Sequence, residues 1–398
     1  MPPVRVPPVS PRRDSRLDVA RGFALFVIFV AHMPMNPFAG LVPARFGFSD
    51  SAEIFVFCSG AAAALAFAQL FETHGLVIGA ARVALRIWQL YWAHIALFLL
   101  VVTTNVVFDH WTGSGTSYVD GFNLGNVIGP HAGQAIVGLF TLTYVPNYFD
   151  ILPMYMVLLA LVPLVVVVSR HGTAAVLALV IGLWLIAGAH LVELPAEPWG
   201  HRSWFFNPFS WQLVFFTGFA FARGWLPVPG YDRRLVAIAV GVLVFGFLLT
   251  WEPLVERAGY PASLMQSLAP MIDKTHAAPL RYLHFLSLAY VAFVLAGEGG
   301  RRLKGKAVDV CRIAGRQALA VFLTGLWLSV VCGYLLQQLG GGALGAVVVN
   351  AGGIAAMTTI AWLVGWFKSE PWRMARKPMP EPSPAPAHIE SSVLSAAH

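Results

Sequence analysis

Two polar residues stand eleven positions apart in the apolar stretch RGFALFVIFVAHMP, residues 21–34. In an α-helix with about 100° per residue, His32 returns to within about 20° of the face of Arg21, about 16 Å farther along the axis. A charge at the centre of a membrane helix costs about 2.5–3.5 kcal/mol by insertion scales, so such residues usually have a function. An imidazole aligned with a guanidinium suits general base catalysis beside a cationic binding group.

The sequence leaves two explanations of Arg21 open. Asp18 lies three residues before Arg21 on the same stripe, so an Asp18–Arg21 pair would neutralise the arginine before it meets the bilayer interior. Alternatively, Arg21 extends to the cytoplasmic headgroups and His32 is a packed polar residue near Pro34. The alignment of Arg21 with His32 favours a functional role for the two together.

The next apolar segment opens with two acidic residues in SDSAEIFVFCSG, residues 49–60. Asp50 and Glu53 have the spacing of a helix-capping box, which is a sufficient explanation of Asp50. Because the first two helices run in opposite directions, Glu53 is expected at the depth of His32, where its carboxylate could orient the imidazole. We therefore predict a catalytic group of His32, Glu53 and Asp50.

Arg82 and Arg86 stand four residues apart in ARVALRIWQLYWAH, at the predicted cytoplasmic start of a third helix. As cytoplasmic anchors they need no further explanation. The alternative is a clamp for the phosphates of a nucleotide-bearing donor, because a guanidinium matches phosphate geometry. Together with Arg21 they form the predicted donor-binding set.

A further polar set lies in three stretches predicted to face outside: LTYVPNYFDILPMY, NPFSWQ and KTHAAPLRYLHFLSLAY. Solubility alone explains many polar residues in loops. The combination of amides, a carboxylate, cations and aromatic faces nevertheless favours a carbohydrate or polyol acceptor. The predicted acceptor-binding residues are Asn147, Asp150, Trp211, Gln212, Lys274, His276, Arg281 and His284.

The elements that must position these residues are predicted to be transmembrane helices. Of the 398 residues 58% are hydrophobic and 11% are charged, which is typical of a polytopic membrane protein. Apolar runs long enough to cross about 30 Å of hydrocarbon predict an all-α integral membrane protein with about ten transmembrane helices. They cover residues 17–36, 51–71, 84–107, 150–168, 173–192, 209–225, 232–251, 281–298, 315–337 and 343–367. The shorter stretch 129–145 is interpreted as re-entrant or interfacial.

The distribution of Lys and Arg orients these helices. With both termini in the cytoplasm, the inner segments hold 20 of these residues and the outer segments hold five, as the positive-inside rule requires. The net charge of +7 is spread over short clusters, which excludes nucleic acid binding. We predict a cytoplasmic segment 1–16, a transmembrane domain 17–367 and a disordered cytoplasmic tail 368–398 rich in Pro, Ala and Ser.

Several kinds of site lack their sequence signatures. Cys58, Cys311 and Cys332 form no CxxC pair, so packing roles are predicted in place of disulfides or a zinc site. The chain has no Gly-rich phosphate loop, no GxSxG and no HExxH. We expect no bound metal and no permanently bound cofactor. The N-terminus has no signal-peptide core, so the first span is expected to act as the targeting signal.

Six stretches resemble, in order and spacing, the OpgC family of integral membrane proteins, known as succinyltransferases of osmoregulated periplasmic glucans. They are RLDVARGFALFVIFVAHMP, FGFSDSAEIFVFCSGAAAA, TLTYVPNYFDILPMY, NPFSWQLVFFTG, KTHAAPLRYLHFLSLAY and GRQALAVFLTG. That family is similar to the acyltransferase-three superfamily, whose first helix carries an Arg, ten residues and a His. Arg21 and His32 match this spacing.

The resemblance implies a multi-pass O-acyltransferase of the bacterial inner membrane. Its partners would be membrane lipid, a cytoplasmic acyl-coenzyme A donor, by analogy succinyl, and a periplasmic glucan acceptor. His32 would be essential, either as a general base or as a covalent acyl-histidine, and the oligomeric state stays open. The alternative is a proton-coupled transporter that uses Asp18, Arg21, His32 and Glu53 as a path. A non-catalytic scaffold would need no aligned Arg and His.

Overall fold

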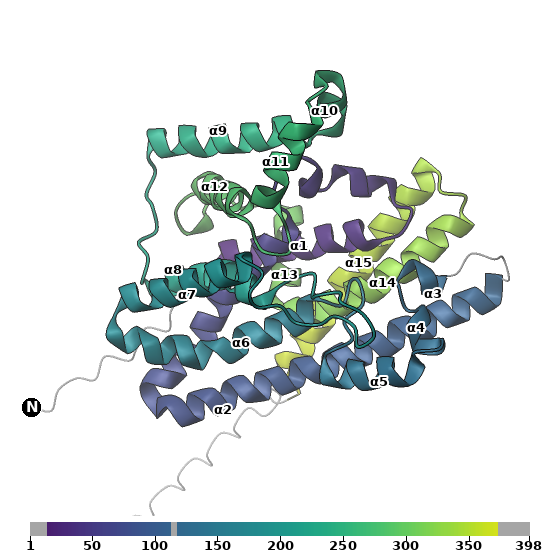
Figure 1. The fold of residues 1–398 in the computed structure, drawn as a ribbon, viewed down its shortest axis with the longest axis horizontal. Helices are drawn as coiled ribbons and strands as arrows, with labels where there is room; N and C mark the ends of the chain where they lie inside the picture. The colour runs from purple at the N-terminus through teal and green to yellow at the C-terminus, as the bar shows by residue number, and fades with distance from the viewer. Residues whose placement is uncertain (1–13, 113–117, 373–398) are drawn as a thin grey trace, which may run out of the picture.

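The structure is a computed structural model that describes residues 14–112 and 118–372. Over these residues the chain is all-helical, and an isolated bridge between Pro195 and Ser203 takes the place of any sheet (Figure 1). The predicted all-α class is therefore confirmed. The predicted N-terminal segment, apart from its last residues, and all but the start of the predicted tail lie outside the described residues.

The helices follow one another along the chain with short connections. In order they are α1 (Ser15–His32), α2 (Ser51–Thr112), α3 (Tyr118–Gly121), α4 (Gly125–Ile128), α5 (Ala132–Thr141), α6 (Ile151–Val168), α7 (Thr173–Gly188), α8 (Pro208–Arg223), α9 (Arg233–Thr250), α10 (Glu252–Ala258), α11 (Ala262–Ile272), α12 (Pro279–Ala296), α13 (Lys306–Arg316), α14 (Ala318–Gln338) and α15 (Ala343–Lys368).

Each of the ten predicted apolar ranges contains a helix. Among the described residues, six helices are long and apolar enough to cross a membrane, namely α2, α6, α9, α12, α14 and α15. The apolar helix α7 has 16 residues, and α1 and α8 are not among the six. In Figure 1, α6 and α9 run in similar directions, whereas α14 and α15 lie side by side at an angle to them.

The second and third predicted helices follow each other directly, with a kink at Gly75 in place of the predicted loop, and together they carry the label α2. Helix α2 has 62 residues, and the single residue with non-helical backbone angles inside it is Gly75. The φ of Gly75 is 78°, in the left-handed region that favours glycine. Helical structure continues on both sides of the kink.

The sequence predicts most of α13 as part of a cytoplasmic loop, because this segment is short and basic. It packs against α1 through a pair of glycines at very close backbone approach. A Cβ on Gly22 would stand 1.8 Å from the carbonyl oxygen of Cys311, and a Cβ on Gly315 would stand 1.8 Å from that of Asp18. These two contacts fix α1 along its axis, as small residues do between membrane helices.

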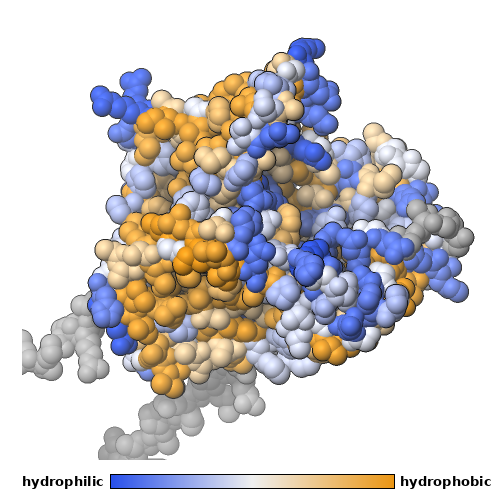
Figure 2. Space-filling view, in the orientation of Figure 1, coloured by the Kyte–Doolittle hydropathy of each residue, from blue (hydrophilic) through white to orange (hydrophobic). Residues whose placement is uncertain are grey.

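The surface is strongly apolar. Figure 2 shows broad hydrophobic areas over α9 and over the side where α7 and α8 lie. Helix α9 has mostly exposed apolar side chains, including Ile238, Val244 and Phe245. Because soluble monomers rarely expose such large apolar areas, lipid is the solvent that this surface fits.

Candidate active site

Two cavities inside the helical bundle contain most of the polar residues that the sequence singled out. One, of about 410 Å³, is lined by His32, Asp50, Asn147, Asp150 and Lys274. The other, of about 330 Å³, is lined by the three predicted donor-binding arginines. His32 therefore shares its cavity with three of the predicted acceptor-binding residues, Asn147, Asp150 and Lys274. The three arginines line the other cavity.

His32 ends α1, where its ring is partly buried. Its Nδ1 lies 2.7 Å from the carbonyl oxygen of Ile28, one turn earlier. A carbonyl oxygen only accepts, so Nδ1 carries the proton and donates, and Nε2 keeps its lone pair. The ring also meets the edge of Tyr148 at a centroid distance of 4.8 Å. The imidazole is thus held in the tautomer that a general base needs.

The two acidic residues at the start of α2 form a charged network with α12. Asp50 caps the helix, accepting from the backbone N–H of Ala52 at 2.7 Å, and its own N–H donates to Glu53 Oε2 at 2.8 Å. Lys274 Nζ donates to Asp50 Oδ2 at 2.6 Å. Arg281 bonds Glu53 Oε1 through Nε and Asp50 Oδ2 through a terminal nitrogen, the latter at 3.2 Å. The capping-box geometry is present, with two cations added to it.

In the structure Glu53 pairs with Arg281 and not with His32, the partner that the sequence suggested. Both of its oxygens are engaged, one by Arg281 and one by the Asp50 backbone, whereas the hydrogen bond of the His32 ring goes to Ile28. Glu53 is 1% exposed, and a fully charged guanidinium balances a carboxylate in such a place better than a neutral imidazole. Arg281 is 228 residues away in the chain, so the sequence pattern gave no sign of it.

Asp150 has the geometry of a group awaiting a ligand. It is 4% exposed, lies directly before α6 and lines the His32 cavity. Its Oδ1 is buried and has no hydrogen-bond partner among the described residues. Because an unsatisfied buried carboxylate oxygen is costly, a bound hydroxyl would stabilise it.

The other predicted acceptor residues do not line the His32 cavity. Trp211 is fully buried and donates from Nε1 to the carbonyl of Lys274 at 2.9 Å. Gln212 joins α8 to α7 by a 2.7 Å bond to the Val180 carbonyl. His284 Nδ1 lies 2.7 Å from the hydroxyl of Ser49, just before α2. Of these, Trp211 supports the backbone of Lys274, which lines the cavity, and His276 belongs to a separate cluster described below.

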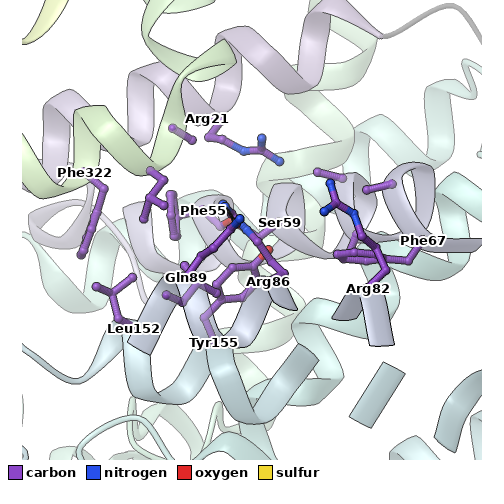
Figure 3. Close-up of a pocket in the computed structure, with 16 residues that line it drawn as sticks. Arg21, Phe55, Ser59, Phe67, Arg82, Arg86, Gln89, Leu152, Tyr155 and Phe322 are labelled. Atoms are coloured by element: carbon purple, nitrogen blue, oxygen red, sulfur yellow. Dashed lines mark hydrogen bonds between the residues drawn. The ribbon is translucent and has the colours of Figure 1, made fainter. Parts of the chain in front are cut away.

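The arginine cavity brings together arginines from two helices. Arg21 reaches it from α1, and Arg82 and Arg86 reach it from α2 (Figure 3). Arg21 is 9% exposed and donates to the carbonyl oxygen of Cys58, while its buried Nε has no hydrogen-bond partner among the described residues. Arg86 bonds Gln89 at 3.2 Å. Asp18 forms an ion pair with Arg316 of α13 at 3.6 Å. Three guanidinium groups around one cavity suit a polyanion.

Phe322 of α14 lines both cavities. Its ring stacks on Phe55 of α2 at a centroid distance of 5.8 Å. Neither Phe322 nor Tyr148 could be recognised as a site residue from the sequence, because aromatic residues in apolar stretches carry no local signal of a site. The arginine cavity and the His32 cavity therefore share one aromatic side chain in their walls. This arrangement suits the transfer of a group from one cavity to the other.

Comparison with known proteins gives one match. A family model described as OpgC protein matches residues 13–369. No curated protein and no solved structure matches the chain. The matched region covers all of α1 to α15 and both cavities.

Proposed function

Because the chain belongs to the OpgC family, we propose that it is an integral membrane O-acyltransferase which moves a succinyl group from coenzyme A to a glucan hydroxyl. The observation that carries this proposal is the pair of cavities on either side of Phe322. The arginine cavity receives the anionic donor, and the His32 cavity receives the sugar. The six long apolar helices support a membrane location, and the charge bias favours the inner membrane with cytoplasmic termini.

In the proposed reaction, His32 Nε2 removes the proton of the acceptor hydroxyl as its oxygen attacks the thioester carbonyl. The new C–O bond forms, the C–S bond breaks, and coenzyme A leaves as a thiolate that takes the proton back from the imidazolium. Asp150, Asn147 and Lys274 line the cavity in which the sugar hydroxyls would bind. An acyl-histidine intermediate is the alternative chemistry, and a burst of coenzyme A without acceptor would distinguish it.

The proposal is tested by coenzyme A release. Purified protein in detergent is expected to free coenzyme A from succinyl-coenzyme A in proportion to added periplasmic glucan, with ester-linked succinate appearing on the glucan. Protein denatured before the assay is the control. A transporter that uses the same residues would release no coenzyme A, so the absence of release with folded protein would contradict the proposal.

The double variant Arg82→Ala, Arg86→Ala is expected to raise the KM for succinyl-coenzyme A about tenfold or more, with a smaller effect on kcat. Hydrogen bonds to charged groups contribute about 1.5–3 kcal/mol each, and contacts remote from the thioester stabilise ground and transition states alike. The measurement is a donor titration at saturating glucan.

The matched control for this variant is Arg234→Ala, a change at an exposed arginine of α9 that lines neither cavity. Arg234→Ala is expected to leave KM unchanged. A loss of kcat with unaltered KM in the double variant would argue against a phosphate clamp. A loss of membrane insertion would support the anchor interpretation.

A further inference from the structure

Three potential metal ligands meet on the loops beside the acceptor cavity. His190 and Glu193 follow α7, and His276 lies between α11 and α12. His190 Nδ1 is 2.9 Å from Glu193 Oε1, and His276 Nε2 is 3.5 Å from the same oxygen. One ligand atom from each of the three residues lies within 4.8 Å of the others. Two imidazoles and one carboxylate therefore surround one point.

Neighbouring side chains hold two of these ligands in place. Asp273 Oδ2 lies 2.7 Å from His276 Nδ1 and also accepts from the His276 backbone N–H at 2.9 Å. Ser203 donates its hydroxyl to Glu193 Oε2. A carboxylate on the far nitrogen of a histidine is the usual support of a metal-binding imidazole, because it fixes the tautomer and increases ligand basicity.

The Nε2 atom of His276 lies nearest to Glu193 and is the strongest indication of a bound cation. In the neutral ring Nδ1 donates to Asp273, so Nε2 keeps its lone pair, and this atom lies 3.5 Å from Glu193 Oε1. Nε2 is buried and has no hydrogen-bond partner among the described residues. A buried nitrogen lone pair facing a carboxylate is unfavourable for both groups, and a cation between them would relieve it.

We propose that His190, Glu193 and His276 bind a zinc ion. Imidazole and carboxylate ligands suit Zn²⁺, which binds them at about 2.0–2.2 Å in a tetrahedron. Small side-chain rotations would bring the present separations to that geometry. His190 has a side chain that is 66% exposed, so the ion can enter from solvent and water can fill the fourth position.

The ion would join two connections that border the acceptor cavity. Lys274, two residues before His276, extends to Asp50 in the cavity wall. The backbone of the same segment accepts from Trp211 Nε1 at Lys274 and from the Asn207 N–H at Thr275, the latter at 3.2 Å. The three ligands line neither described cavity. The zinc would therefore act structurally, holding this wall in position, and the proposal does not depend on acyl transfer.

The test uses full-length protein purified without a histidine tag, stripped with a chelator, incubated with Zn²⁺ and freed of excess metal. Elemental analysis is expected to find one zinc per chain, and Zn²⁺ is expected to raise the Tm of stripped protein. Co²⁺ in place of zinc is expected to give the visible absorption of a tetrahedral site.

The variants Glu193→Gln and His276→Ala are expected to lose the bound zinc and the rise in Tm. His201→Ala is the matched control, because it removes an exposed histidine of the same connection outside the cluster. It is expected to keep both. Zinc well below one per chain in the wild type would overturn the proposal, as would equal zinc content in wild type, Glu193→Gln and His276→Ala. Glu193→Gln keeps the shape of the side chain, so this variant is expected to fold like the wild type. Gel filtration of both proteins verifies this.

Discussion

His32→Ala is expected to reduce the rate of acyl transfer by a factor of about 10² to 10⁴, which is the usual contribution of a general base. The structure gives the reason: Nδ1 is engaged by the Ile28 carbonyl, which leaves Nε2 with its lone pair, and His32 lines a cavity. The change removes a partly buried side chain at the last residue of α1, so the helix should persist. The measurement is succinyl transfer to glucan, with donor binding measured separately.

Two further variants define what the imidazole contributes. His32→Gln keeps a donor for the Ile28 carbonyl but has no basic nitrogen, so it is expected to be as inactive as His32→Ala. His74→Ala, at an exposed histidine of α2, is expected to retain full activity. Turnover of His32→Ala within a few-fold of wild type, with intact donor binding, would show that another group acts as the base.

Arg281→Met is expected to destabilise the protein by about 3–5 kcal/mol, the usual effect of removing one partner of a buried ion pair. Arg281 is 8% exposed and contacts both Glu53 and Asp50. Without the guanidinium, Glu53 would stay buried with no cation directly bound to it, since Lys274 contacts Asp50. The expected measurement is a large fall in Tm in detergent and a low yield of monodisperse protein.

Two comparisons separate charge from packing. Arg281→Met combined with Glu53→Gln removes both charges, and is expected to recover part of the lost stability. Arg223→Ala breaks an exposed ion pair with Glu72, whose side chain is 58% exposed, and is expected to cost less than about 1 kcal/mol. An Arg281→Met variant as stable as Arg223→Ala would contradict the buried-pair interpretation.

The helices could be predicted because the signal for them is local. A run of apolar residues records its burial in lipid residue by residue, so every predicted range contains a helix. The alignment of Arg21 with His32 is also local, since it needs only the helical repeat. Helix α13 could not be predicted from an apolar run because it is short and basic. The kink at Gly75 could not be predicted because it depends on a single residue with left-handed backbone angles.

The partners of the polar side chains could not be predicted in the same way. Arg281 and Glu53, which form an ion pair, are 228 residues apart in the chain. Helices α8 to α11 lie between Glu193 and His276 in the chain. Such pairings depend on which helices become neighbours, and the neighbours of a helix cannot be read from a single sequence. The sequence therefore pointed to several polar residues that line the His32 cavity, but it carried no sign that Glu53 pairs with Arg281.

Helix α1 carries Arg21 into one cavity and His32 into the other. An α-helix barely stretches, so the roughly 16 Å between the two residues along its axis acts as a ruler. A donor whose anionic part lies much closer than this to its reactive carbonyl cannot engage both groups at once. Under the proposed function, the length of the arm that carries the acyl group would thus be selected by the backbone itself, before any side chain recognises the acyl group.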